Sequence, residues 1–504
     1  MELLEFKEKA FKILDCTDTS KIGDKLLNAV INNNLNIFEQ FEDVLSEDKD
    51  WFQALWQYYE ADRAEKKQDY TPKSLCKLVS TLVGECKSVY DCCGGSGALT
   101  LQCLKDHKID DVYVEELDNR VIPFLLFNLA LHNANGYVVN GDVLTNEITK
   151  AYQITKGAKY SDVKEISTDD IPKISVDVAV SNPPYNIKWR APLPLENDGR
   201  FPIIPPASNA NWAFIFNCLS KADKAVLILP NGILSEGTER DIRKYFVDND
   251  FIEKVIIMPE KMFEVTSIST CIVVINKSKQ RKGTVKFIDS RKNCVTEYRE
   301  QNGQFGGASH TNRTYKKAYN ILNSVNIEKI LNAPDNQPEF SALISNKEIA
   351  QNDYLLVPSR YIKFIEQDQT HRPFQEIADN INYITRMQNA CKLWINEAIA
   401  KKLGVDVEKF KEEKESSIQL AKKQSELTGI KLDTSDYIQF TKNKNEFCFK
   451  CNDKEILPDI LLQFFSVWKN QIALLNTMQN QYLIELRDAL LPDLISGKIN
   501  TGEE

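Results

Sequence analysis

The sequence predicts an α/β protein with a mostly parallel, doubly wound sheet of the Rossmann-like kind. From residue 70 to about 290, short apolar segments alternate with amphipathic helical segments. Most of the apolar segments are continuous, which is typical of parallel strands that are buried on both faces. Glycines and acidic residues follow several of them directly, as expected at the carboxyl edge of a nucleotide-binding sheet.

The chain has 504 residues, which is enough for several structural units. Helical periodicity predicts a helical N-terminal segment over residues 1–65. The α/β domain covers 66–290, and a mixed region follows over 291–388. Residues 389–504 combine a charged helical run with apolar residues at helical spacing, so a mostly helical C-terminal region is expected.

The α/β domain contains seven predicted strands in chain order. They are residues 88–92, 111–117, 136–143, 176–180, 224–230, 253–259 and 270–277. Two stretches interrupt the alternation of strands and helices. Residues 151–173 are polar and are expected to be an insertion, and the proline-rich residues 191–210 are expected to form a long surface loop beside the active face.

Composition argues against several classes of protein. No apolar run approaches the roughly 18 residues of a membrane-spanning helix, and residues 1–15 do not resemble a signal peptide. The twelve cysteines are therefore expected to be reduced thiols, and the lone pair Cys448 and Cys451 is not expected to bind a metal. The net charge of −9 is unusual for a protein that holds nucleic acid alone, so a basic surface is local or a partner supplies contacts.

The first three predicted strands end in residues that suit a nucleoside. Asp91 is followed by a glycine-rich turn, the second strand ends at Glu116, and the third ends at Asp142. The turn residues expected to approach the ligand are Gly94, Gly95, Ser96 and Gly97. Their spacing is not G-x-G-x-x-G, which favours S-adenosylmethionine over a nicotinamide cofactor. The alternative is that the glycines merely turn the chain and the acids merely cap helices.

The fourth strand ends in the sequence Asn182-Pro183-Pro184-Tyr185. The Asn182 side chain and the Pro183 carbonyl are able to accept hydrogen bonds from an amino group, which leaves more electron density on its nitrogen. Tyr185 offers a flat face for a planar substrate, a contact worth roughly 1–3 kcal/mol. The prolines fix the carbonyl in advance. The motif therefore predicts methyl transfer to an NH2 group, and the alternative is a plain strand-ending turn.

Longer stretches resemble the modification subunit of type I restriction–modification systems, a gamma-class N6-adenine DNA methyltransferase. The resemblance covers about residues 65–365. Two positions depart from the family loop, with Cys92 where proline is usual and Gly94 where cysteine is usual. The stretches that carry the resemblance are DYTPKSLCKLV (69–79), DCCGGSGAL (91–99), NWAFIFNCLSKADKAVLILPNGILSEGTERDIRKYF (211–246), VIIMPEKMFEVTSISTCIVVINK (255–277) and EIAQNDYLLVPSRYI (348–362).

The resemblance implies transfer of a methyl group from S-adenosylmethionine to adenine N6 in duplex DNA, after base flipping. It implies that Glu116 bonds the cofactor's ribose and Asp142 its adenine. The methionine part would be flanked by Tyr70, Thr71 and Pro72, with Asp91, Gly94, Gly95, Ser96, Gly97 and Asn182 completing the cofactor site. Two other amine acceptors stay open, a protein glutamine and an RNA base, and so does an inactive scaffold.

Other residues have two interpretations each. Phe263 lies where related enzymes carry a second aromatic ring against the flipped base, or it is a core residue. Lys188 and Trp189 follow the Asn-Pro-Pro-Tyr motif and contact the DNA strand, or they belong to a solvated loop. Cys92 and Cys93 are expected to be only small residues beside the cofactor, because amine methylation needs no thiol nucleophile.

The resemblance also implies partners. A specificity subunit is expected to dock on the C-terminal helices, a restriction subunit is a further candidate, and the cytoplasm of a bacterial or phage-infected cell is the expected location. Residues 482–499 resemble a helix end of the specificity subunit itself, so 389–504 serves docking or part of DNA recognition. Leu486, Leu490 and Leu494 form an apolar stripe if one helix continues past Pro492. An intramolecular helix pair is the alternative.

Overall fold

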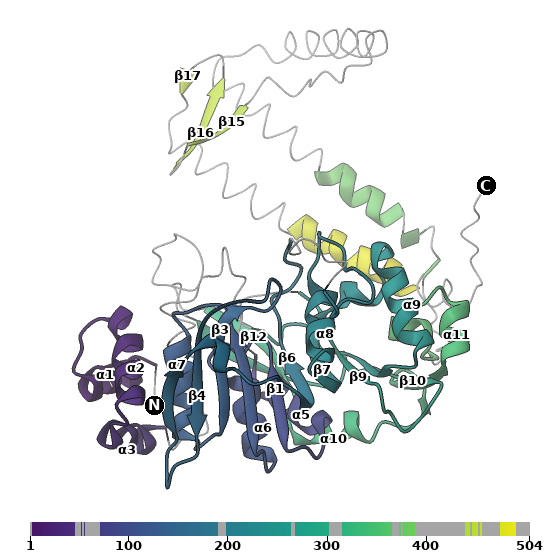
Figure 1. Cartoon of the computed structure of the whole chain (residues 1–504). Helices are drawn as coiled ribbons and strands as arrows, with labels where there is room; N and C mark the ends of the chain where they lie inside the picture. The colour runs from purple at the N-terminus through teal and green to yellow at the C-terminus, as the bar shows by residue number, and fades with distance from the viewer. Residues whose placement is uncertain are drawn as a thin grey trace, which may run out of the picture. The chain divides into compact units, whose positions relative to one another are not determined.

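The computed structural model divides the chain into two compact units, Met1–Ile365 and Glu366–Glu504 (Figure 1). The structure describes residues 3–45, 52, 55, 71–189, 198–263, 268–301, 315–364, 372–373, 376–377, 379–388, 439–443, 446–451, 454–455 and 474–489. No helix within these residues is long and apolar enough to cross a membrane.

The first unit is built on one large mixed sheet whose centre is parallel, as the sequence predicts. All seven predicted strands are present. They are β1 (Ser88–Asp91), β2 (Asp111–Glu116), β3 (Gly136–Asp142), β6 (Val176–Ser181), β7 (Ala222–Pro230), β8 (Ile252–Ile257) and β9 (Thr270–Asn276). The central order is β3-β2-β1-β6-β7, all parallel, and β9 runs antiparallel between β7 and β8.

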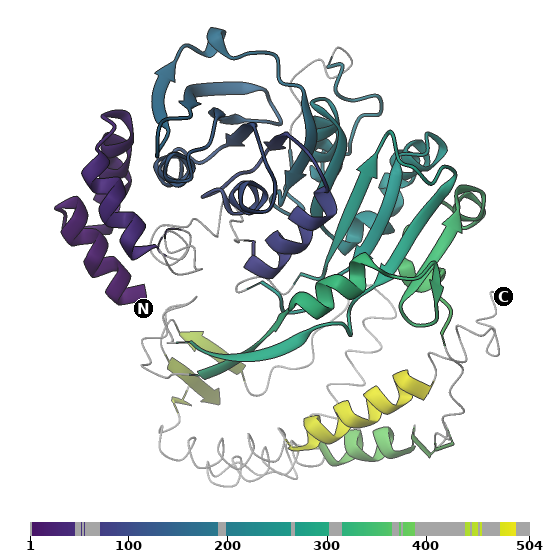
Figure 2. The same ribbon diagram turned by 90° about the horizontal axis from the view of Figure 1, so that it is seen from below.

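Burial on both faces explains why these strands are continuous apolar runs. Val89 and Val178 face one hydrophobic cluster, and their chain neighbours Tyr90 and Ala179 face the other. Helices α5 (Lys73–Val83), α6 (Ala98–Asp106) and α7 (Ile122–Leu131) contribute to the first cluster. Helices α8 (Asn211–Leu219), α9 (Arg240–Asp248) and α11 (Asn346–Gln351) contribute to the second (Figure 2).

Antiparallel strands extend the sheet at both edges. Next to β3 lie β4 (Glu147–Thr155) and β5 (Asp162–Ile166), so the polar stretch 151–173 is sheet rather than a simple insertion. At the other edge β10 (Thr284–Asp289) pairs with β14 (Ser341–Ser345), which in turn pairs with β13 (Asn336–Gln337). Because β14 is part of the same sheet, residue 290 is not the end of the compact unit.

The predicted N-terminal helices are present over residues 3–45 and pack on the sheet's helical layer, whereas nearly all of 46–65 lies outside the described residues. They are α1 (Leu3–Leu14), α2 (Ile22–Ile31) and α3 (Leu35–Val44). The ring of Phe38 stacks on that of Phe127 in α7 with centroids 4.8 Å apart. The Tyr160 hydroxyl, between β4 and β5, donates to the Glu42 carboxylate at 2.6 Å. The edge hairpin and the helical segment are therefore joined.

Smaller elements complete the first unit. An antiparallel ribbon consists of β11 (Val295–Gln301) and β12 (Tyr315–Ile321), and α10 (Ser324–Leu331) follows it. The 3-10 helices are η1 (Thr19–Lys21), η2 (Thr168–Asp170), η4 (Asn231–Leu234), η5 (Gly237–Glu239) and η6 (Pro358–Arg360).

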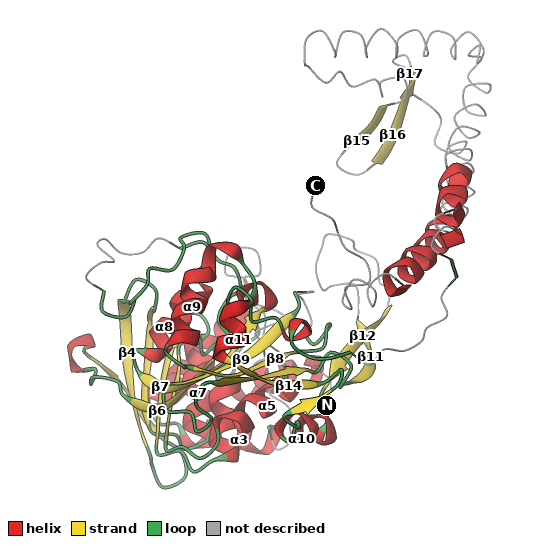
Figure 3. Cartoon of the chain, turned by 90° about the vertical axis from the view of Figure 1, so that its right-hand side faces the viewer, coloured by secondary structure: helices red, strands yellow, loops and turns green. Residues whose placement is uncertain are grey.

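The second unit contains a helix pair and a small sheet. The sheet was not predicted from the sequence. The sheet consists of β15 (Gln439–Asn443), β16 (Glu446–Cys451) and β17 (Lys454–Glu455). Helical residues 379–388 and 474–489 lie side by side (Figure 3). Gln388 Nε2 donates to Asn476 Oδ1 at 2.8 Å, and Arg372 Nε donates to Glu485 Oε1 at 2.7 Å, so the pair is antiparallel.

This helix pair supports the intramolecular interpretation of the C-terminal stripe. Leu486 is half-buried, whereas Leu490 and Leu494 lie outside the described residues. Part of the pair's surface remains apolar, because Leu483 and Ile484 are exposed.

Candidate active site

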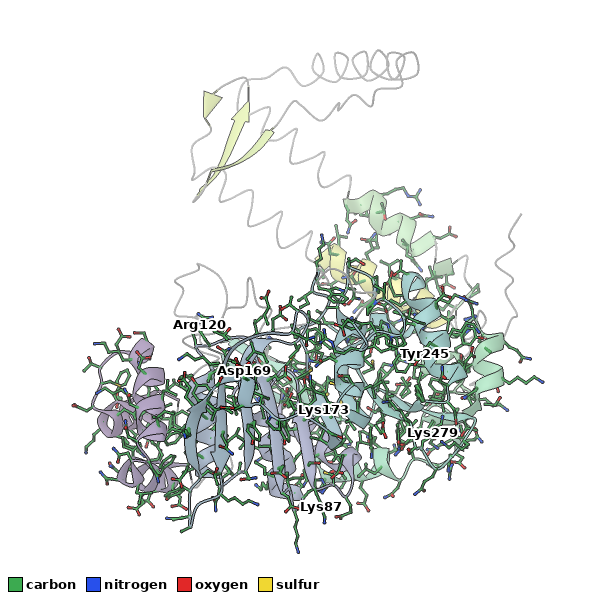
Figure 4. All side chains as sticks on the ribbon, in the orientation of Figure 1. Lys87, Arg120, Asp169, Lys173, Tyr245 and Lys279 are labelled. Atoms are coloured by element: carbon green, nitrogen blue, oxygen red, sulfur yellow. The ribbon has the colours of Figure 1, made fainter. Side chains whose placement is uncertain are left out.

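The parallel strands β1, β2, β3 and β6 have their carboxyl ends at one edge of the sheet. Lys87 precedes β1 and Arg120 follows β2, and the two lie at opposite ends of the sheet (Figure 4). The edge on Arg120's side is therefore the carboxyl edge. Asp91 is paired with Val180, two residues before Asn182. The strand order reverses at β1 and β6, and such a switch point is where open α/β sheets bind ligands.

The glycine-rich turn after β1 lies directly against β2. Gly94 N donates to the Glu115 carbonyl at 3.0 Å, and a Cβ on Gly94 would come within 2.2 Å of the Val114 side chain. Gly95 N donates to Glu116 Oε2 at 2.8 Å. Only glycine allows this close approach, and the approach fixes the Glu116 carboxylate beside the turn.

Asp91 is a buried carboxyl at the end of β1, with 1% of its surface exposed. Its two oxygens accept hydrogen bonds from Cys93 N at 3.2 Å and from the Thr100 hydroxyl at 3.3 Å. Burial, and to a smaller extent the neighbouring Cys92, raise the pKa of Asp91 to about 8. The group is therefore mostly neutral at pH 7, so it supports the turn without adding a negative charge under the site.

The Asn-Pro-Pro-Tyr motif presents an amide and an aromatic ring at the end of β6. Asn182 Nδ2 donates to the Thr71 hydroxyl at 3.0 Å, and the Tyr185 hydroxyl donates to Asn182 Oδ1 at 2.6 Å. The rings of Tyr185 and Phe263 are perpendicular, at 89°, with centroids 6.2 Å apart. The structure therefore brings together an amide acceptor and two aromatic rings from separate parts of the chain.

The comparisons with known proteins agree with this geometry. The model of the family described as N-6 DNA Methylase matches residues 42–370. The chain belongs to the N-6 DNA methylase family. This confirms the family resemblance, and similar proteins include methylase subunits of type I restriction enzymes.

Two such relatives illustrate the extent of the similarity. The MpnII methylase subunit of Mycoplasma pneumoniae is 27% identical over 66% of this chain and 59% of its own length. The HindI methylase subunit of Haemophilus influenzae is 26% identical over 72% of this chain and 78% of its own length. The chain thus spans less than two thirds of the first relative. A crystal structure of a type I methyltransferase subunit from Streptococcus thermophilus is 25% identical, covers 65% of this chain and 67% of its own, and gives a TM-score of 0.49.

Two groups at this edge of the sheet bear on how S-adenosylmethionine fits this N-6 DNA methylase family member. Ser96 Oγ is buried and has no hydrogen-bond partner within the described residues, so a polar ligand group is able to satisfy it. Glu116 Oε2 accepts a hydrogen bond from Gly95 N and its Oε1 accepts one from Asp118 N, so the carboxylate is held at the end of β2, where an acceptor suits ribose hydroxyls. These residues fit the cofactor.

Two further predicted cofactor positions lie at the same edge. Half-buried Asp142 ends β3, and its Oδ1 accepts a hydrogen bond from Leu144 N at 2.9 Å. Thr71 is buried and Pro72 is the residue before α5, so the segment before that helix reaches Asn182. Tyr70 lies outside the described residues.

Of the two residues singled out after the motif, Trp189 is buried although both of its predicted roles need an accessible side chain. The Trp189 indole is 6% exposed, packs on Phe201 with centroids 5.6 Å apart, and donates to the Pro206 carbonyl. Trp189 is therefore packed in the core, so the solvated-loop interpretation is wrong for it, and the DNA contact stays a prediction. Lys188 is exposed.

Cys92 and Cys93 are free thiols beside the glycine-rich turn. Buried Cys92 donates to the Ser181 hydroxyl at 3.2 Å and lies 3.6 Å from the Cys218 sulfur in α8, so it fills the space between β1, β6 and that helix. Throughout the part of the chain that the structure describes, no group of three or more potential metal ligands is found.

Sequence reasoning missed a buried polar group on the α8 side of the site. The group includes Asp198, Arg200 and Asn217. The Arg200 guanidinium donates hydrogen bonds to both of the others. The available signal was an Asp-x-Arg pair inside an otherwise apolar, proline-rich loop, where a charged pair needs a buried or functional role.

Proposed function

We propose that this chain transfers the methyl group of S-adenosylmethionine to the N6 amino group of an adenine that has been flipped out of duplex DNA. The observation that supports this most is the arrangement around Asn182. Its amide oxygen lies at the carboxyl end of β6, next to the glycine-rich turn, and the rings of Tyr185 and Phe263 stand at right angles beside it.

S-adenosylmethionine supplies the methyl group, and the protein's own residues prepare the acceptor. In this structure the Tyr185 hydroxyl occupies Asn182 Oδ1. An adenine amino group that replaces it exchanges one hydrogen bond for another, so little is lost on binding. The carbonyl of Pro183 is a second acceptor held by a rigid backbone. Two acceptors on one NH2 group raise the electron density of its nitrogen, which makes it a better nucleophile.

The two aromatic rings support the flipped base. Stacking on Tyr185 is worth roughly 1–3 kcal/mol, which is comparable with the few kcal/mol needed to remove a base from the duplex. Phe263 is 3% exposed and contacts Tyr185 by its edge, so it sets the orientation of that ring in the free protein. Both interpretations of Phe263, core residue and base contact, are compatible with this position.

The cofactor is proposed to lie along the carboxyl edge of β1, β2 and β3. Glu116 would hold the ribose and Asp142 the adenine amino group. Thr71 and Pro72 would flank the methionine part, and the neutral Asp91 would support the turn. Asn182, Pro183 and Tyr185 are together called the acceptor clamp. The Thr71–Asn182 hydrogen bond then links the methionine side of the cofactor to this clamp.

We further propose that the chain is the modification subunit of a type I restriction–modification or related defence system in the bacterial cytoplasm. Its relatives are named as methylase subunits of type I restriction enzymes. A specificity subunit would dock on the C-terminal helix pair, where Leu483 and Ile484 are exposed and available for packing against other helices. A restriction subunit would join through that assembly.

The experiment is expression in a bacterial host that lacks DNA methylation, followed by long-read sequencing for N6-methyladenine. Expression together with a specificity subunit that binds this chain should methylate one defined motif. A genome without N6-methyladenine, together with methylated protein glutamine or RNA from the same cells, would contradict DNA as the substrate. Cofactor binding without any transfer would favour a scaffold.

The variant Asn182→Ala tests the clamp in the same assay. Transfer should fall by about 10²-fold or more, as for the loss of one preorganised transition-state contact. The Kd for S-adenosylmethionine should stay within about threefold, because the amide is proposed to hold the acceptor. Asn249→Ala removes an amide that caps α9 away from the site and is the matched control. Full turnover of Asn182→Ala would show that the clamp is not used.

A further inference from the structure

A buried arginine connects the proline-rich loop to the end of β3. Arg200 Nη1 donates to the Val143 carbonyl at 2.6 Å and Nη2 to the Leu144 carbonyl at 3.3 Å. The same guanidinium donates to Asp198, with Nη2 and Oδ2 2.6 Å apart, and its side chain is only 10% exposed. The two carbonyls belong to the residues that directly follow Asp142, the proposed adenine contact.

The arginine also belongs to a buried network beneath the other strand ends. Arg200 Nη1 donates to Asn217 Oδ1 in α8 at 3.1 Å, and Asn217 Nδ2 donates to the Tyr90 hydroxyl at 2.7 Å. The Tyr90 hydroxyl donates to Glu115 at 3.0 Å, and Lys221 lies 3.2 Å from the same carboxylate. Tyr90 and Glu115 directly precede Asp91 and Glu116, so the network touches the ends of all three cofactor strands.

Packing holds the arginine in one place. The guanidinium lies over the Phe201 ring, 4.9 Å from its centroid. Phe201 in turn packs on Trp189, which follows the Asn-Pro-Pro-Tyr motif, and on Phe216 in α8. The loop that begins at the acceptor clamp is thus anchored by aromatic rings and delivers Arg200 to the cofactor side of the sheet. This gives buried Trp189 a role that its sequence position did not suggest.

From this geometry we infer that Arg200 is a positioning residue for the cofactor's purine. It fixes the backbone after β3, and through that backbone the Asp142 carboxylate, at a set place relative to the clamp. The inference rests on the proposed function. A planar guanidinium supplies five donors in a rigid fork, and here they serve a carboxylate, an amide and two carbonyls together. A lysine ammonium has three donors and cannot reproduce that set.

The test compares Arg200→Lys with Arg243→Lys. Arg243 is the matched control because it is also buried and also donates to two backbone carbonyls, those of Tyr354 and Glu236, which lie outside the network. Both variants should lower the melting temperature. Arg200→Lys should raise the Kd of S-adenosylmethionine at least about tenfold, as expected for a lost charged hydrogen bond, and Arg243→Lys should change it less than about twofold.

Two further readouts separate positioning from general damage. The Kd of adenosine alone should rise by the same factor as that of S-adenosylmethionine, because the purine side is affected. At saturating cofactor, kcat should stay within about threefold of the wild type. Asp198→Asn keeps the size of the side chain but replaces one of the two oxygens that accept from Arg200 with an NH2 donor. It is the second variant if Arg200→Lys does not fold, and it should raise both Kd values by a smaller factor.

The outcomes distinguish this inference from the proposed function. An unchanged Kd in folded Arg200→Lys, or an equal rise in Arg243→Lys, would overturn the positioning role while DNA methylation stands. A wild-type chain that binds S-adenosylmethionine and methylates no DNA would contradict the proposed function and leave the binding comparison valid. A wild-type chain that binds neither adenosine nor S-adenosylmethionine would overturn both.

Discussion

At the residue scale, the side chains of the acceptor clamp have separable roles. The Tyr185 hydroxyl donates to Asn182 Oδ1 in the structure, whereas the proposed use of Tyr185 depends on its ring. Tyr185→Phe should therefore retain transfer, with a KM for DNA within about threefold of the wild type. Tyr185→Ala should lose the roughly 1–3 kcal/mol of stacking, a factor of about 5 to 150 in kcat/KM. Steady-state kinetics on a duplex with one target adenine would measure both. Equal losses in the two variants would show that the hydroxyl, not the ring, is the functional group.

Asp91 predicts a pH dependence of stability with a defined sign. Burial raises its pKa from 3.8 to about 8 in the folded protein, so the unfolded chain binds fewer protons between these values. Its stabilising contribution is complete below about pH 4 and is lost as the pH rises through about 8, by at most about 1.4 kcal/mol per pH unit. The melting temperature of the wild type relative to Asp91→Asn, measured without cofactor, should therefore fall from pH 5 to pH 8.5.

Asp106 supplies the opposite case as a control. Burial acts to raise the pKa of Asp106, but hydrogen bonds from Lys77 and Gln102 outweigh it and hold the pKa below 3.8. The contribution of Asp106 is present above pH 4 and is lost only as the pH falls further. The difference between the wild type and Asp106→Asn should be flat over pH 5 to 8.5. A rise of the Asp91 difference with pH would mean that its carboxyl is ionised in the folded protein.

At the element scale, the glycine-rich turn is set against β2 by one close contact. A Cβ on Gly94 would lie 2.2 Å from Val114, a stiff, buried β-branched side chain, so Gly94→Ala forces the turn away from the strand. Overpacking of this kind costs about 1–3 kcal/mol. The displaced turn should also weaken S-adenosylmethionine binding. Gly237→Ala, which meets nothing within 4 Å, is the neutral control.

A double-mutant cycle tests whether the contact with Val114 causes the loss of stability in Gly94→Ala. If the Val114 side chain is the obstacle, Gly94→Ala should cost less in a Val114→Ala background than in the wild type. Thermal melting and cofactor titration would both report this coupling. Strict additivity of the two changes would exclude the contact as the cause.

The same scale shows what the sequence was able to predict. The central strands were found because burial on both faces makes continuous apolar runs, as at 176–180. Strands β4 and β5 were missed because buried Tyr152, Ile154 and Val163 have polar neighbours along the chain, among them exposed Thr155 and Lys164, which makes the stretch polar on average. The motif Asn182–Tyr185 was identifiable because its chemistry is local. Arg200 was not, because a loop has no periodicity and its partners beyond the loop come from the two residues after β3 and from α8.

At the scale of the whole molecule, charge and surface suggest a chain that acts with partners. The chain carries 63 basic and 72 acidic residues, a net charge of −9. Binding of DNA through phosphates depends on clustered positive charge and weakens steeply with salt. The described helix pair in the second unit exposes Leu483 and Ile484, which suits docking of another helical protein. These two observations are consistent if a partner that docks there supplies most of the DNA contacts.

This predicts how DNA affinity depends on the partner. The chain alone should bind a labelled duplex only weakly, with a Kd above about 1 μM at 150 mM salt, in the range of non-specific binding. Adding the specificity subunit should tighten binding by about 10³-fold or more for its target sequence. Leu483→Glu with Ile484→Glu should abolish this gain, since a carboxylate in a helix interface is costly, and should leave the Kd for S-adenosylmethionine unchanged. Fluorescence anisotropy across a salt series measures each value. A nanomolar, salt-resistant complex of the lone chain would instead assign DNA recognition to this chain, and the gain surviving in the double variant would move the docking surface away from the helix pair.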